Sequence, residues 1–164
     1  MAPEHDRTVG DMLIALYRLP AYCADDFSGA VIRKPLAPEY DLVVRWVGQQ
    51  FSPGWASEAR SAVANRPVSL FIAMRGGDLV GFCCYDATAR GFVGPIGVDA
   101  RAHGQGVGAA LLRACLADMG AVGYAYAIAG AVGAPGFFRR VAGATPIPDS
   151  TPGIYKGLLR DPLV

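Results

Sequence analysis

The most informative stretch of the chain is GPIGVDARAHGQGVGAALL, residues 94–112. Its first residues have the apolar pattern of a strand that ends at Val98, and its last residues begin a helix. Between the two, Gly104, Gly106 and Gly108 alternate with other residues. Glycines at a helix start let unpaired backbone amides point at one place, which favours binding of a phosphate or pyrophosphate. The alternative is a plain turn in which the glycines only permit positive φ angles.

Two other phosphate-binding motifs fit this stretch poorly. Gly104, Gly106 and Ala109 match the dinucleotide-binding spacing, but that motif needs an acidic residue at the end of the next strand. The sequence has no acidic residue between Asp118 and Asp149. The nucleoside-triphosphate loop needs Gly-Lys followed by Ser or Thr, which the chain lacks. A nucleotide-binding oxidoreductase fragment is therefore disfavoured.

The composition is that of a folded, nearly neutral chain. Of its 164 residues, 52% are apolar and 18% are charged, with 15 basic residues against 14 acidic ones. This balance excludes a disordered chain. It also argues against a nucleic-acid partner, because no basic run is longer than the pair Arg139-Arg140. The length favours one domain.

The four cysteines form no C-x-x-C pair and the chain has two histidines, so we expect no metal site. The pair Cys83-Cys84 lies in an apolar run, which predicts buried side chains, with a vicinal disulfide as the alternative.

Two segments bear on localisation. Residues 1–11 hold acidic residues and no apolar core, so they predict no secretory signal. The stretch from Met119 to Phe138 is uncharged and long enough to span a bilayer. Its glycines and Pro135 instead predict a strand, a turn and the start of a helix. We therefore expect a cytoplasmic protein with no membrane partner.

The hydrophobic patterning predicts a mixed α/β sheet. Ser52 is the expected N-cap of a helix with Pro53 at its first position. Pro95 lies inside a strand, where it indicates a bulge or an edge. In chain order the predicted elements are a helix at 8–19, a strand at 31–34, helices at 38–51 and 52–65, a hairpin at 68–86, a strand at 92–98, a helix at 107–119, a strand at 124–129, a helix at 135–141 and a strand pair at 144–147 and 153–159.

The glycine-rich loop resembles the coenzyme-A-binding motif of the GNAT superfamily of N-acyltransferases. That motif is Gln/Arg-x-x-Gly-x-Gly/Ala after a strand, and here His103 stands in place of the Arg or Gln. A second family motif, a helix with Phe-Tyr before a glycine, resembles residues 135–144, with Phe138 in place of the tyrosine. The resemblance covers about residues 30–160. It implies an added segment with a short helix at residues 1–29 and an N-acetyltransferase domain at residues 30–164.

The resemblance implies a mixed, mostly antiparallel sheet flanked by helices, with two strands that splay apart. The splayed strands would be 94–98 and 124–129, and the pantetheine arm of acetyl-CoA would pair between them with the backbone of the first. A backbone N–H near Ile96–Gly97 would polarise the thioester carbonyl. The residues implied to bind acetyl-CoA are Ile96, Gly97, Val98, His103, Gly104, Gln105, Gly106, Val107, Gly108, Ala109 and Phe138.

The implied reaction is direct attack of a neutral amine on acetyl-CoA in a ternary complex. Many relatives place a glutamate on the strand before the loop, but residues 92–98 hold no acid. Asp86 and Glu58 are the candidate bases, with a solvated surface carboxylate as the alternative for each. Because Phe138 replaces the family's tyrosine, Tyr126 and Tyr155 are the candidate acids for the leaving thiolate.

The expected acceptor is a small amine or an amino sugar. Segments such as GPIGV and IPDSTPGIY resemble a bacterial subgroup that includes amino-sugar acetyltransferases, which adds an amino sugar as an acceptor hypothesis. The near-neutral charge argues against a polycationic peptide. The fold often pairs, so a homodimer is compatible with the resemblance. A second function class stays open, because Phe138 and the acid-free strand also fit a non-catalytic acyl-CoA-binding module.

Overall fold

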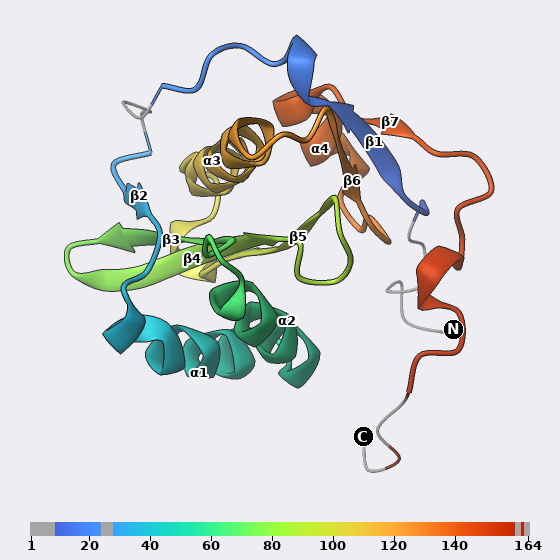
Figure 1. Cartoon of the computed structure of the whole chain (residues 1–164). Coiled ribbons are helices and arrows are strands. Elements are labelled where there is room, and N and C mark those ends of the chain that lie inside the picture. Colours follow the sequence, from blue (N-terminus) through green and yellow to red (C-terminus); the bar gives the residue numbers. More distant parts are fainter. Residues whose placement is uncertain (1–8, 24–27, 160–161, 163–164) are drawn as a thin grey trace.

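The structure is a computed structural model that describes residues 9–23, 28–159 and 162. Within these residues the centre is a seven-stranded sheet in the order β2-β3-β4-β5-β6-β1-β7 (Figure 1). Neighbouring strands are antiparallel except β5 and β6, which are parallel. The strands are β1 (Met12–Ala15), β2 (Val31–Arg33), β3 (Leu70–Arg75), β4 (Asp78–Tyr85), β5 (Phe92–Val98), β6 (Tyr126–Ala129) and β7 (Thr145–Pro146).

Helices cover both faces of the sheet (Figure 1). Alternate side chains of β4 point to opposite faces, because successive residues of a strand do so. Phe82 and Cys84 pack into a core with the first two helices, whereas Cys83 and Tyr85 pack into a second core with the other two. The helices are α1 (Tyr40–Gln50) and α2 (Pro53–Ala64) on one face, and α3 (Val107–Ala121) and α4 (Pro135–Ala142) on the other.

Several local predictions are confirmed. The Ser52 hydroxyl accepts a hydrogen bond from the Trp55 amide at 3.1 Å, and Pro53 takes the first position of α2. The hairpin of β3 and β4 forms as expected. The register between β4 and β5 shifts between Cys83 and Tyr85, opposite Pro95, which is the predicted bulge. The fold class, a mostly antiparallel mixed sheet flanked by helices, is also confirmed.

The helix predicted at 8–19 is wrong. Its described part forms β1, followed by a 3-10 turn at Leu16–Arg18. The sequence Met-Leu-Ile-Ala-Leu is apolar at every position, so its pattern cannot separate helix from strand. Pairing with β6 makes this segment a strand, because β1 lies along the edge of β6 that faces away from β5. The segment expected as an addition therefore shares the sheet with the domain predicted for residues 30–164.

The strand predicted at 153–159 is also wrong, although its expected neighbour forms as β7. Residues Gly153–Tyr155 are a short 3-10 helix. Gly153 and Gly157 have φ angles of +58° and +76°, which an extended strand does not contain. The chain therefore folds back here instead of adding a strand.

The structure also tests the expectations for the pair Cys83-Cys84 and for the uncharged stretch after residue 118. Cys83 and Cys84 are free and buried, so the core interpretation holds rather than the vicinal disulfide. The uncharged stretch from Met119 to Phe138 divides into the end of α3, β6 and the start of α4. Within the described ranges, none of the helices combines the length and apolar character that a bilayer crossing needs.

Candidate functional site

The beginning of β5 pairs with the end of β6, and the two chain segments then separate. Their register joins Phe92 to Ile128 and Val93 to Ala129, and it ends there. Beyond Val93, β5 continues to pair with β4 alone as far as Val98. The resulting gap lies at the carboxyl ends of two parallel strands, where α/β sheets commonly bind ligands. The splay that the family resemblance implied is therefore present.

The pleat of β5 decides which of its peptide groups face this gap. The Asp99 amide donates to the Val80 carbonyl at 2.8 Å, and Val98 lies opposite Gly81. Hydrogen-bonding direction alternates along an antiparallel strand. The N–H and C=O groups of Ile96 and Val98 therefore point away from β4 and into the gap. The amide of Gly97 points the other way, to β4, so the N–H available at the gap is that of Ile96.

The glycine-rich loop places the amino end of α3 beside this gap. Gly106 is the N-cap residue, with a φ angle of +82° that glycine adopts without strain. The first hydrogen bond of the helix runs from the Ala110 amide to the Gly106 carbonyl at 3.0 Å. The preceding amides of Val107, Gly108 and Ala109 have no carbonyl within the helix to bond. Together with the helix dipole they form a site suited to an anion.

The gap and the loop form one cavity of about 740 Å³. This volume lies within the range of ~300–1,000 Å³ that small-molecule sites usually have. Every residue predicted to bind acetyl-CoA lines it except Gln105. The lining residues are Ile96, Gly97, Val98, Ala102, His103, Gly104, Gly106, Val107, Gly108, Ala109, Arg113, Ala134, Phe137, Phe138, Arg140 and Val141.

Gln105 and Asp99 hold the loop instead of facing the cavity. The Gln105 side chain accepts from Arg75 of β3 and donates to the Arg101 carbonyl at 3.1 Å. The buried Asp99 carboxylate accepts from the Arg101 amide and guanidinium. These hydrogen bonds lower the pKa of Asp99 to about 2. The carboxylate is therefore ionised near neutral pH, and the turn between β5 and α3 is fixed from its outer side.

Of the wall that α4 contributes, the sequence identified Phe138 alone. Phe137 and Phe138 meet edge to face there, with ring centroids 5.2 Å apart. Arg113 of α3 and Arg140 of α4 add two exposed guanidinium groups, and neither is paired with another described residue. The amphipathic pattern of residues 135–142 was a signal for a packed helix. Which of its polar residues face the cavity depends on how α4 docks on α3.

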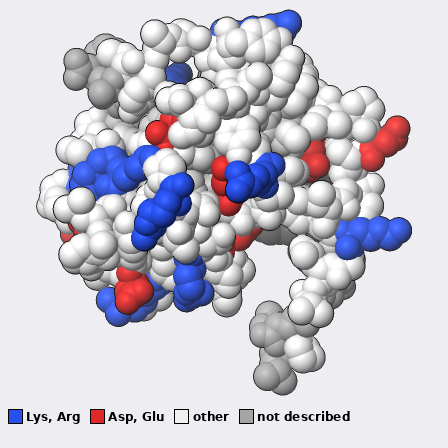
Figure 2. All heavy atoms as spheres, in the orientation of Figure 1, with Lys and Arg blue, Asp and Glu red and all other residues white. Residues whose placement is uncertain are grey.

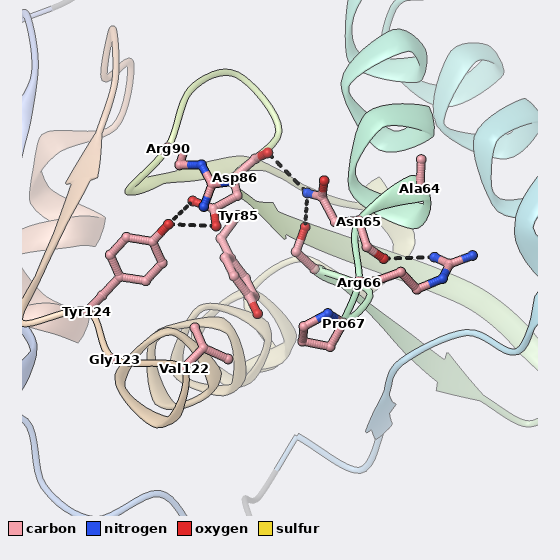
Figure 3. Close-up of a pocket in the computed structure, with 11 residues that line it drawn as sticks. Ala64, Asn65, Arg66, Pro67, Tyr85, Asp86, Arg90, Val122, Gly123 and Tyr124 are labelled. Carbon is pink, nitrogen blue, oxygen red and sulfur yellow. Dashed lines mark hydrogen bonds between the residues drawn. The ribbon is translucent and has the colours of Figure 1, made fainter.

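Asp86 lies at the opposite end of α3, in a separate pocket of about 700 Å³ (Figure 3). That pocket adjoins Val122–Tyr124, after the helix, whereas the first cavity adjoins the residues before it. Figure 3 shows Asp86 and Tyr124 pointing toward one another. The Tyr124 hydroxyl donates to the Asp86 carboxylate at 2.8 Å, and the Gly91 amide donates to it at 2.7 Å. Asp86 is thus engaged in closing the β4–β5 turn, away from the splayed strands.

Tyr126 is also absent from the lining of the first cavity. It begins β6, whereas the separation of β5 and β6 follows the other end of that strand. Its hydroxyl lies 3.2 Å from the Tyr17 hydroxyl, and the two rings meet edge to face. The structure therefore pairs Tyr126 with the segment after β1 and does not bring it to the gap.

Tyr155 lies where β6 ends. A Cβ atom added to Gly130, the residue after β6, would meet the Tyr155 hydroxyl at 2.1 Å. Burial, and then the charges of Asp11 and Glu58, raise the pKa of this hydroxyl to about 12. Among the described residues it has no hydrogen-bond partner. Tyr155 is therefore a protonated donor held beside the point at which β5 and β6 part.

Glu58 approaches from the other face of the sheet. It belongs to α2, and its carboxylate accepts a hydrogen bond from Thr88 in the β4–β5 turn. It does not line the first cavity. Its charge nevertheless contributes to the raised pKa of Tyr155, so the two groups lie within electrostatic reach. Glu58 and Tyr155 are thus linked by charge, with no hydrogen bond between them, and neither lines the cavity.

Comparison with solved structures shows the same fold in other proteins. The chain is similar to a GCN5-related N-acetyltransferase from Sphaerobacter thermophilus, with a TM-score of 0.65 and 24% identity over 83% of this chain and 47% of that one. A GCN5-related N-acetyltransferase from Kribbella flavida gives a TM-score of 0.57 and 17% identity over 84% and 53%. The glucosamine N-acetyltransferase region of a fungal multi-domain GH3 beta-N-acetylglucosaminidase gives 0.66 and 14% over 84% and 19%. The chain thus spans about half or less of the length of these proteins.

The family comparison is more direct. Among proteins with curated descriptions, none matches the chain. The sequence model of the acetyltransferase (GNAT) family matches residues 40–143. This range includes α1, α2, the splayed strands, the glycine-rich loop and α4. That range is more than half of the 164 residues and contains all the residues that line the cavity. The chain therefore belongs to the acetyltransferase (GNAT) family.

Proposed function

We propose that this chain transfers the acetyl group of acetyl-CoA to a primary amine of a small molecule, by direct attack of the amine in a ternary complex. One observation carries the proposal. The cavity joins the open peptide groups of β5 to the unpaired amides at the start of α3. This combination suits a ligand that has an extended amide-bearing arm at one end and phosphates at the other, which is the chemistry of coenzyme A.

The residues present fit such a ligand. The amides of Val107, Gly108 and Ala109 would hold the pyrophosphate, since anions bind at helix amino ends. Arg113 and Arg140 would add positive charge near the phosphates. The arm would lie along Ile96 and Val98 as an added strand. The Ile96 amide would donate to the thioester carbonyl oxygen as negative charge develops on it.

The chemical roles are assigned to Glu58 and Tyr155. In the reaction the amine nitrogen bonds to the thioester carbon, the carbon–sulfur bond breaks, and the amine loses one proton. Glu58 would take that proton, directly or through water. Tyr155 would donate a hydrogen bond to the departing thiolate, because its pKa of about 12 keeps the hydroxyl protonated at any assay pH. The thiolate would then take its proton from solvent.

Tyr155→Phe should lower kcat about tenfold, less than the ~100-fold or more typical of a general acid, because a thiolate is a weakly basic leaving group. Binding of acetyl-CoA should stay unchanged, since the hydroxyl would act only when negative charge develops on the departing sulfur. Tyr126→Phe is the matched control and should keep full activity, because its hydroxyl bonds Tyr17. Steady-state kinetics on the three proteins measures both effects. An unaltered kcat in Tyr155→Phe would remove Tyr155 from the mechanism.

We propose a small amine, with amino sugars as the first class to test. Acidic and basic side chains are interspersed over the face shown in Figure 2, and uncharged atoms cover most of it. The net charge of +1 agrees with that mixture. A polycationic peptide would need a strongly acidic groove, so this surface favours a small acceptor over a basic tail.

The proposal is tested by thiol release. The purified chain is incubated with acetyl-CoA and a panel of amines that includes glucosamine and simple alkylamines, and free coenzyme A is titrated. Cys23 is an exposed thiol, so the chain alone supplies the background. Amine-dependent release supports an acetyltransferase. Tight binding of acetyl-CoA without release from any amine would favour the non-catalytic acyl-CoA-binding module, which Phe138 and the acid-free strand also fit.

A further inference from the structure

One side chain of the loop already bonds the open edge of β5. The Val98 carbonyl points into the gap between β5 and β6, and His103 Nε2 lies 2.8 Å from its oxygen. A carbonyl oxygen only accepts hydrogen bonds, so Nε2 carries the proton. The peptide groups of Ile96, one step along the same edge, receive no side-chain hydrogen bond from the described residues. The imidazole thus stands at one of the two positions where an added strand would pair.

The imidazole is held there by little else. His103 is exposed, and it directly follows the 3-10 turn Ala100–Ala102, with its backbone amide 3.3 Å from the Ala100 carbonyl. Within the described part of the chain, its second ring nitrogen has no hydrogen-bond partner. A single hydrogen bond on an exposed ring exchanges readily with another donor, because water or a ligand can satisfy both groups. A ligand N–H can therefore replace the imidazole as the donor to the Val98 carbonyl.

We propose that His103 is a displaceable plug in the cavity: its imidazole satisfies the Val98 carbonyl in the free chain, and an amide N–H of the ligand's extended arm takes its place. This inference rests on the proposed function, because only a ligand with such an arm competes for this carbonyl. The displaced ring stays next to Gly104 and the amino end of α3, on the phosphate side of the cavity. His103 therefore opposes binding of the arm without opposing binding of the phosphates.

Calorimetric titration of two ligands into the wild-type chain and His103→Ala tests this directly. Coenzyme A carries the arm, whereas adenosine 3′,5′-bisphosphate has phosphates and no arm. The variant should bind coenzyme A about fivefold more tightly, the factor expected when one hydrogen bond no longer has to be exchanged. It should show no such gain in affinity for the bisphosphate. Equal or weaker binding of coenzyme A by a folded His103→Ala chain would overturn the plug.

A spectroscopic measurement gives the same test without a substitution. The sequence has two histidines, His5 and His103, so the ¹⁵N signals of labelled imidazoles are simple to assign with the variant. The free chain should show His103 as the Nε2-protonated form. Coenzyme A should shift that signal, and the bisphosphate should leave the Nε2–H hydrogen bond in place. Failure of the wild type to bind coenzyme A at all would overturn the proposed function, whereas normal binding with an unmoved His103 signal would overturn the plug alone.

Discussion

Gly106→Asp should raise the dissociation constant for acetyl-CoA at least 100-fold while the chain still folds. Space exists for the side chain, since the atoms nearest to an added Cβ are those of Ser28 at 3.9 Å. Aspartate also tolerates the left-handed backbone better than most residues. Its carboxylate would lie beside the unpaired amides of α3 and repel a phosphate there. Two unit charges ~5 Å apart at an effective dielectric constant of ~20 repel by about 3 kcal/mol, which corresponds to a factor above 100.

Gly106→Asn separates charge from backbone strain. Asparagine has nearly the same shape as aspartate and the same tolerance of a positive φ angle, but it carries no charge. We expect its dissociation constant to rise less than tenfold. Calorimetry on the three proteins, with circular dichroism as the folding control, measures the difference. Equal losses in both variants, or an unaltered affinity in Gly106→Asp, would contradict a phosphate site at the start of α3.

Gly97→Ala should destabilise the chain by about 2–3 kcal/mol, near the upper end of what one extra methyl costs in a packed core. Gly97 lies in β5 with the Phe51 ring directly over it, and an added Cβ would approach three ring carbons at 2.5–2.8 Å. That ring cannot easily move, because it packs against Trp46, Trp55 and Phe82. The strain falls on the strand that supplies the wall of the cavity. Urea denaturation followed by tryptophan fluorescence measures the loss.

A smaller side chain at position 51 should restore part of the stability that Gly97→Ala loses. Phe51→Leu alone should cost stability, because it removes aromatic contacts from a half-buried cluster. In the double variant with Gly97→Ala the smaller side chain relieves the clash, so the combined loss should be less than the sum of the single losses. Additive losses, or a Gly97→Ala chain as stable as the wild type, would show that the close approach of Phe51 to β5 is not what requires glycine there.

Local signals explain why much of the cavity was predictable. The apolar run of 92–98, the alternating glycines and the helix that follows are contiguous in sequence, and each acts through neighbouring backbone atoms. Their assembly into a strand, a loop and an anion-binding helix start therefore needs little information from elsewhere. The splay itself was not visible in the residues and came only from the family resemblance.

The parts that the sequence did not predict are placed by distant contacts. Segment 12–15 is apolar at every position, so only pairing with β6 makes it a strand. Tyr155 reaches the end of β6 because the chain folds back over β1, where the Asp11 amide donates to the Ser150 hydroxyl at 2.8 Å. Arg140 faces the cavity because α4 docks against α3. No periodic pattern in the neighbouring sequence predicts any of these positions.

Thermal unfolding with and without acetyl-CoA tests the cavity most directly, with NADH as the control ligand. A ligand at 100 times its dissociation constant stabilises a native protein by roughly 2.7 kcal/mol. For a chain of this length that corresponds to a rise in Tm of several degrees. We predict this rise with acetyl-CoA and none with NADH. An unchanged Tm at millimolar acetyl-CoA would mean that the glycines before α3 form only a turn, and it would contradict the proposed cosubstrate.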